Sequence, residues 1–83
     1  MRFTVVWTKS AQAALARIWV RAPDRQAIAD AADEVDRMLR MAPLTTGTPF
    51  GTDRYLLEPP LEVIFSVSPD DCLVTVVQVA CHL

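Results

Sequence analysis

The sequence predicts an α+β fold with the element order β-α-α-β-β-β. We expect a mainly antiparallel four-stranded sheet with a helical hairpin packed on one face. Three observations lead to this prediction: an alternating strand pattern near the start, two successive amphipathic helix patterns, and three strand-like segments in the second half. At 83 residues, the chain is expected to form a single domain over residues 1–83.

The first strand and the first helix follow each other directly. In "RFTVVW" the residues Phe3, Val5 and Trp7 alternate with more polar positions, which is typical of a strand. Thr8 or Ser10 can cap the helix that follows. In "SAQAALARIWVRA" the apolar residues recur at helical spacing; they are Ala11, Ala14, Leu15, Ile18, Trp19 and Ala22. This pattern places both tryptophans in the core.

A second helix is predicted from about Arg25 to Met41. Pro23 ends the first helix, and Asp24 is a suitable N-cap for the second. The short connection predicts an antiparallel helical hairpin. The predicted buried face consists of Ile28, Ala31, Ala32, Val35, Met38 and Leu39. The expected ion pairs on the solvated face are Asp33–Arg37 and Asp36–Arg40.

The second half predicts a loop and three strands. The loop "APLTTGTPFGTD" is rich in proline and glycine, and the strands are "RYLLE", "LEVIFSVS" and "CLVTVVQVAC". Pro59 and Pro60 cannot donate ladder hydrogen bonds, so we place them in the connection between the first two strands. The last strand is apolar on both faces, which predicts a central place in the sheet. The face that the helices leave uncovered should carry Glu62, Ser66, Gln78 and His82.

Composition limits the functional classes. The net charge of −2 disfavours a domain that binds nucleic acid mainly through phosphates. Cys72 and Cys81 would lie about 30 Å apart along one strand, whereas a disulfide requires Cα atoms within about 7 Å. Free thiols fit a reducing cytoplasm. We find no signal peptide, no transmembrane stretch, and no pattern for a cofactor or a metal, and we expect none of these.

The sequence resembles the RelE/ParE superfamily of toxins from bacterial type II toxin–antitoxin (plasmid stabilisation) modules. The matching segments cover nearly the whole chain in order: "FTVVWTKSAQAALARIW", "APDRQAIADAADEVDRMLRMAP" with the following Gly47, and "RYLLEPPLEVIFSV...DCLVTVVQV". The resemblance implies a cytoplasmic toxin that a cognate antitoxin silences. Some members of the superfamily cleave messenger RNA on the ribosome, and others inhibit DNA gyrase.

Three residues are candidates for RNA cleavage, which requires a base, an acid and a cation for the phosphate. His82 could act as acid or base, Arg54 could bind the phosphate, and Glu62 supplies a carboxylate on the same predicted face as His82. Each has a structural alternative. His82 could be a solvated terminal residue, and Arg54 could pair with Asp53, Glu58 or Glu62.

The sequence departs from the RNA-cleaving pattern in three ways. Active relatives typically have arginine at the position of Glu62, where a carboxylate repels phosphate. They also continue past the last strand with further basic residues, whereas this sequence ends at Leu83, and they are basic rather than acidic. We therefore expect a toxin-like protein with a degenerate catalytic set. The alternatives are an active messenger-RNA endoribonuclease (an mRNA interferase) and a gyrase inhibitor that acts by binding. We also expect self-association when the antitoxin is absent.

Overall fold

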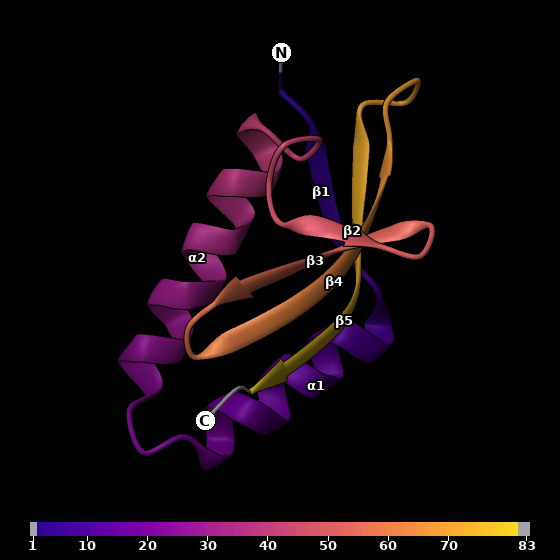
Figure 1. Cartoon of the computed structure of the whole chain (residues 1–83). Helices are drawn as coiled ribbons and strands as arrows, with labels where there is room; N and C mark the ends of the chain where they lie inside the picture. Colours follow the sequence, from indigo (N-terminus) through magenta and orange to yellow (C-terminus); the bar gives the residue numbers. More distant parts are fainter. Residues whose placement is uncertain (1, 82–83) are drawn as a thin grey trace.

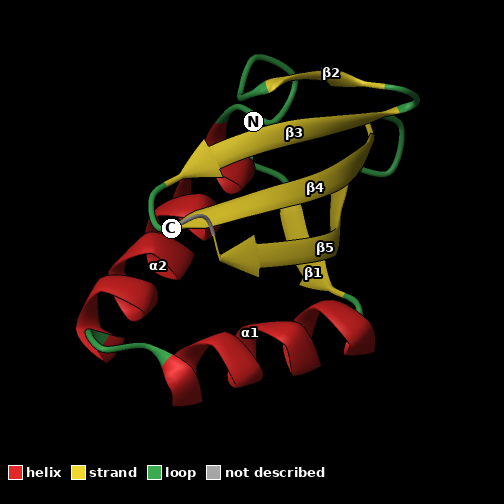
Figure 2. Cartoon of the chain, turned by 60° about the horizontal axis from the view of Figure 1, so that its bottom comes forward, coloured by secondary structure: helices red, strands yellow, loops and turns green. Residues whose placement is uncertain are grey.

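The structure is a computed structural model that describes residues 2–81. Two helices pack against one twisted sheet of five strands (Figures 1 and 2). The sheet order is β1-β5-β4-β3-β2. The elements are β1 (Thr4–Trp7), α1 (Lys9–Arg21), α2 (Arg25–Met41), β2 (Thr48–Phe50), β3 (Asp53–Glu58), β4 (Leu61–Ser68) and β5 (Leu73–Cys81).

The sheet differs from the prediction in one strand and one pairing. The predicted four-stranded sheet has a fifth, three-residue strand, β2, which pairs antiparallel with β3 at the edge. Its sequence reads as loop because Pro49 lies in the middle, but an edge strand tolerates proline where no ladder hydrogen bond is needed. Gly51, with φ of +63°, forms the tight turn that returns the chain from Phe50 to Asp53. The remaining difference is β1, which runs parallel to β5, so the sheet is mixed.

The helix boundaries follow local signals. The Thr8 Oγ1 accepts a hydrogen bond from the Ala11 N–H at 3.1 Å, and the Asp24 Oδ1 accepts one from the Ala27 N–H at 3.1 Å. These N-caps confirm the predicted starts of α1 and α2. On the exposed face of α2 the predicted pair Asp36–Arg40 forms at 2.6 Å.

The other predicted ion pair on α2 is wrong. Arg37 pairs with Glu34 rather than Asp33, and its Nε donates to the Glu34 Oε1 at 2.7 Å. The longer glutamate side chain lets the guanidinium contact both carboxylate oxygens. This hydrogen bond is the main reason why the pKa of Glu34 is lowered and that of Arg37 is raised.

Both helices lie on the same face of the sheet (Figure 2), and the core lies between that face and the helices. Alternate residues of the central strands are fully buried there: Leu61, Val63 and Phe65 on β4, and Val74 and Val76 on β5. A bulge opposite Ile64 and Phe65 shifts the register, so that Val79 also points into this core. The predicted arrangement, with both helices on one face and β5 inside the sheet, is confirmed.

Two further features concern the cysteines and the length of the helices. Cys72 directly precedes β5 and Cys81 is its last residue, and the two cysteines are not joined by a disulfide. Within residues 2–81, neither helix has the length and apolar character needed to cross a membrane.

Candidate functional site

Arg54 is tied to the loop that follows α2. Its Nε donates to the carbonyl oxygen of Thr46 at 2.9 Å, and its Nη2 donates to that of Gly47 at 3.1 Å. Among the described residues, Arg54 forms none of the ion pairs proposed from the sequence. The guanidinium therefore holds the loop against β3.

Glu62 lies on the other face of the sheet from Arg54. In the β3–β4 ladder Arg54 pairs with the core residue Phe65, so its side chain lies on the core face of the sheet. Glu62 lies between the core residues Leu61 and Val63 on β4, and successive side chains of a strand point to opposite faces, so Glu62 lies on the other face. The structure thus does not bring these two candidates together. His82 lies outside the described residues, so the catalytic roles of Arg54, Glu62 and His82 stay predictions.

Tyr55 is the partner of Glu62 on the uncovered face. Its hydroxyl donates to the Glu62 Oε2 at 2.9 Å. This hydrogen bond raises the pKa of Tyr55, with smaller contributions from burial and from the negative charge of Glu62. With Ile64, Gln78 and Ala80, the pair encloses a hollow of only about 30 Å³. That space is smaller than a nucleotide base.

The two tryptophans occupy different environments. Trp7 packs against the core, as predicted. The prediction for Trp19 is wrong: its side chain is 43% exposed, and the Arg25 guanidinium lies over its ring at 4.6 Å. In the "IWV" run of residues 18–20, three consecutive apolar side chains spread around more of the helix than a core can cover. That run is the sequence signal for an exposed apolar surface on this helix.

Helix α1 is much less buried than α2. In α1 only Ala11 is buried, whereas Ile28, Ala31, Val35 and Leu39 are buried in α2. On α1, Trp19 and Val20 are exposed to solvent, and Val20 is 61% exposed. The chain's own core therefore leaves much of the apolar surface of α1 uncovered.

These exposed apolar side chains of α1 line a broad groove. It runs between α1 and α2 and reaches the edge strand β1, with a volume of about 990 Å³. We call it the α1–α2 groove; its lining includes Val6, Trp7, Leu15, Trp19, Val20 and Ala29. Exposed apolar side chains in a concave surface are typical of a protein-binding site.

The edge of β1 offers little room for strand addition. The Thr4 and Thr8 N–H groups donate to β5 or its flank, so Phe3, Val5 and Trp7 present their backbone groups outward. Of these, the Phe3 N–H donates to the Arg40 carbonyl at 2.9 Å, and the Trp7 carbonyl accepts from the Gln12 side chain at 2.9 Å. The part of the β1 edge that a partner strand could use is therefore centred on Val5.

Comparisons with solved structures identify proteins that have a similar fold. No protein-family model matches the sequence, and no curated protein is similar to it. A chain in the crystal structure of the toxin–antitoxin complex RelBE2 from Mycobacterium tuberculosis superposes with a TM-score of 0.83 at 15% identity, covering 99% of this chain and 93% of that one. A chain of the chromosomal ParDE system from P. aeruginosa has a TM-score of 0.76 at 22% identity, covering 99% and 98%. The fold expected from the RelE/ParE resemblance is confirmed.

Proposed function

We propose that this chain is the toxin component of a toxin–antitoxin pair of the plasmid stabilisation type and acts in the bacterial cytoplasm. In this proposal a small antitoxin neutralises it by laying an amphipathic helix in the α1–α2 groove. The observation that carries the proposal is the incomplete burial of α1, whose Trp19 and Val20 are exposed in a groove. The likeness in fold to chains of two toxin–antitoxin systems supports it.

The chemistry of the groove indicates how a partner would be held. Trp19 offers a large, rigid apolar surface of the kind that contributes most to binding energy at interfaces. Val20, which is 61% exposed, extends that surface. A helix with apolar residues at i, i+3 and i+4 spacing would cover these side chains and exclude water from them.

For the mode of action, we propose binding rather than RNA cleavage, with a degenerate catalytic set. Arg54 donates to two loop carbonyls, and Glu62 lies on the opposite face of the sheet. A carboxylate at position 62 and a net charge of −2 both disfavour RNA phosphate. A gyrase-type inhibitor needs no catalytic set. The alternative is a ribosome-dependent endoribonuclease, and experiment must distinguish it from a protein that acts by binding.

Growth assays test the neutralisation. The chain is expressed from an inducible promoter in a bacterial host, with and without the product of the reading frame adjacent to its own gene. We expect inhibition of growth that the neighbouring product relieves. Val20→Asp should stay toxic but escape relief, because a carboxylate would be buried under the partner helix. Ala13→Asp, an exposed α1 position outside the groove, is the matched control and should still be relieved.

The same strain separates binding from cleavage. Messenger RNA ends are mapped after induction of the wild-type chain, Arg54→Ala and His82→Ala, with folding checked by circular dichroism. Toxicity without new RNA ends, retained by both folded variants, is the expected result. New RNA ends that either substitution abolishes in a folded domain would establish the endoribonuclease instead. A wild-type chain without any toxicity would contradict the toxin proposal.

A further inference from the structure

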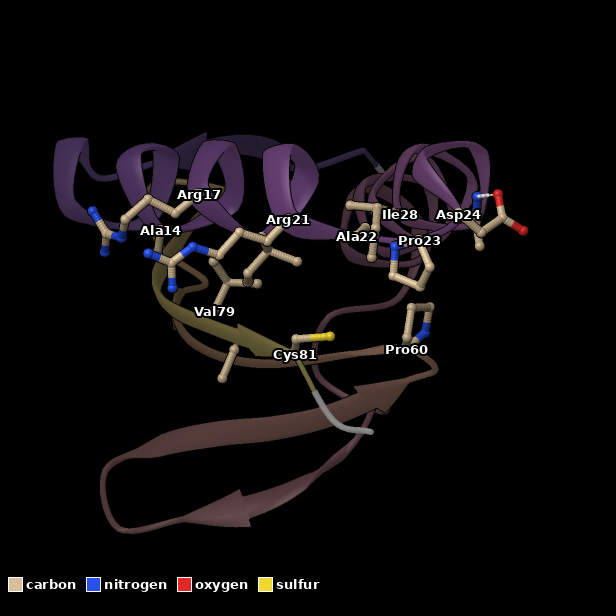
Figure 3. A pocket seen from close by; sticks show the side chains of 13 residues that line it. Ala14, Arg17, Arg21, Ala22, Pro23, Asp24, Ile28, Pro60, Val79 and Cys81 are labelled. Carbon is tan, nitrogen blue, oxygen red and sulfur yellow. Dashed lines mark hydrogen bonds between the residues drawn. The ribbon is translucent and has the colours of Figure 1, made fainter.

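A second groove lies on the other flank of α1. It is bounded by α1, the turn into α2, the end of β5 and Pro60, and has a volume of about 540 Å³ (Figure 3). We call it the α1–β5 groove. The side chains of Ile18, Ala22, Ile28 and Val79 make its wall apolar. It follows α1 from Ala14 to Ala22, which corresponds to about 12 Å of helix, or a little over two turns.

Positive charge is concentrated at one end of this groove. Arg17 and Arg21 lie one helical turn apart, and Figure 3 shows both guanidinium groups on the same side of the groove. At the other end, the Asp24 carboxylate accepts the hydrogen bond that caps α2. The groove therefore combines an apolar wall with a basic end.

The carboxylates of residues 2–81 do not pair with these two arginines. On α2, Arg37 and Arg40 are paired with Glu34 and Asp36. Within residues 2–81, by contrast, no ion pair or side-chain hydrogen bond engages Arg17 or Arg21. No carboxylate lies four residues before or after either of them on α1.

We infer that the α1–β5 groove binds an acidic amphipathic helix of a partner protein, with two carboxylates one turn apart facing Arg17 and Arg21. The apolar face of that helix would cover Ile18 and Val79. Glutamates at i and i+4 have the same spacing along a helix as the two arginines. A nucleic acid fits less well, because the wall of the groove is apolar and its other end carries Asp24.

The identity of the partner rests on the proposed function: the antitoxin would hold α1 from both flanks, with this segment in addition to the helix in the α1–α2 groove. The charge preference of the groove does not depend on that identity. It can be measured with synthetic peptides and the full chain, without a growth assay.

The probe is a fluorescent helical peptide of about 14 residues, with leucines on one face and two glutamates four positions apart beside that face. Matched peptides carry glutamine or lysine at those two positions. Binding to the wild-type chain is followed by fluorescence anisotropy. We expect the glutamate peptide to bind best and its affinity to fall with salt.

Variants of the chain then locate the site. The double variant R17A/R21A should weaken binding of the glutamate peptide by roughly three- to thirty-fold, the effect of two exposed ion pairs, and leave the glutamine peptide nearly unchanged. R37A/R40A removes the same charge from α2 outside both grooves and should leave both affinities unchanged. R17E/R21E should prefer the lysine peptide, a reversal that a purely structural role of the arginines could not produce.

The outcomes of the two proposals are separable. Failure of the wild-type chain to bind the glutamate peptide, equal loss in R37A/R40A, or absence of the charge reversal in a folded R17E/R21E chain would overturn the inference, whatever the growth assay shows. A chain that shows the charge reversal but never inhibits growth would overturn the toxin proposal and leave the acidic-helix site standing.

Discussion

Arg54 stabilises the loop after α2 through two hydrogen bonds from its guanidinium. Replacing it with alanine leaves the Thr46 and Gly47 carbonyls without these donors, so we expect Arg54→Ala to lower the free energy of unfolding by about 1–3 kcal/mol. Urea unfolding followed by circular dichroism measures this loss. Arg2→Ala, at an exposed position, is the control and should change stability by less than about 0.5 kcal/mol. Equal stability of the two variants would contradict the structural role of Arg54.

Tyr55 is the only tyrosine of the chain, so its ionisation can be followed directly by absorbance. Its hydrogen bond to Glu62 raises the pKa, and the phenol should titrate above its ordinary value of about 10. Glu62→Gln removes the anion and should return the pKa toward that value. An unchanged titration curve in Glu62→Gln would show that the pair does not form in solution.

The same pKa shift predicts how stability depends on pH. Because the folded chain holds the tyrosine proton more tightly than the unfolded chain does, this contribution to stability is complete below about pH 10 and declines as the pH rises through the raised pKa of Tyr55. Tyr55→Phe should abolish this part of the pH dependence. Urea midpoints of both chains, measured from neutral to alkaline pH, provide the comparison.

At the scale of elements, the β2–β3 hairpin depends on two glycines with different surroundings. Both have positive φ, +70° at Gly47 and +63° at Gly51. A Cβ on Gly47 would overlap the backbone carbonyl of Tyr55, whereas a Cβ on Gly51 would meet no atom within 4 Å.

We expect Gly51→Ala to lower the free energy of unfolding by about 1–2 kcal/mol, the left-handed backbone penalty alone. Gly47→Ala should lower it by more than about 3 kcal/mol, since the backbone of β3 must also move. Urea unfolding of the two variants side by side tests the difference. Similar losses would mean that the close approach of Gly47 to β3 is not maintained.

The two helices also differ as elements. Helix α2 buries a complete stripe against the sheet, whereas α1 buries Ala11 and leaves grooves on both flanks. α2 therefore contributes mainly to stability, and α1 is the element suited to a partner. This division agrees with the charges, because Arg37 and Arg40 of α2 are paired with carboxylates of α2, whereas no carboxylate within residues 2–81 pairs with Arg17 or Arg21 of α1.

At the scale of the whole molecule, exposed apolar surface on both flanks of α1 predicts self-association when no partner is present. Sedimentation velocity should show an average mass that rises with concentration for the wild-type chain. Val20→Asp places a charge in the α1–α2 groove and should shift the distribution toward monomer. Ala13→Asp, outside the groove, should behave like the wild type. A wild-type chain that stays monomeric at high concentration would contradict this prediction.

The local sequence determined the elements and most of their ends. Thr8 and Asp24 cap the helices, and the 3.6-residue period of residues 25–41 sets the buried face of α2. The alternation in "LEVIFSVS" sets the buried face of β4. These features depend on residues a few positions apart, so they can be read directly from the chain.

Tertiary structure decided the rest, because pairing between distant strands controls which side chains meet. The parallel contact of β1 with β5 joins the two ends of the chain, and no local pattern encodes it. The register across the Pro59–Pro60 turn places Arg54 and Glu62 on opposite faces. Trp19 lies on an apolar stripe in the sequence, yet the way α1 lies on the sheet leaves it exposed beside a groove. The candidate binding surface therefore emerges only when the helices are placed on the sheet, since a groove is formed by residues that are far apart in the sequence.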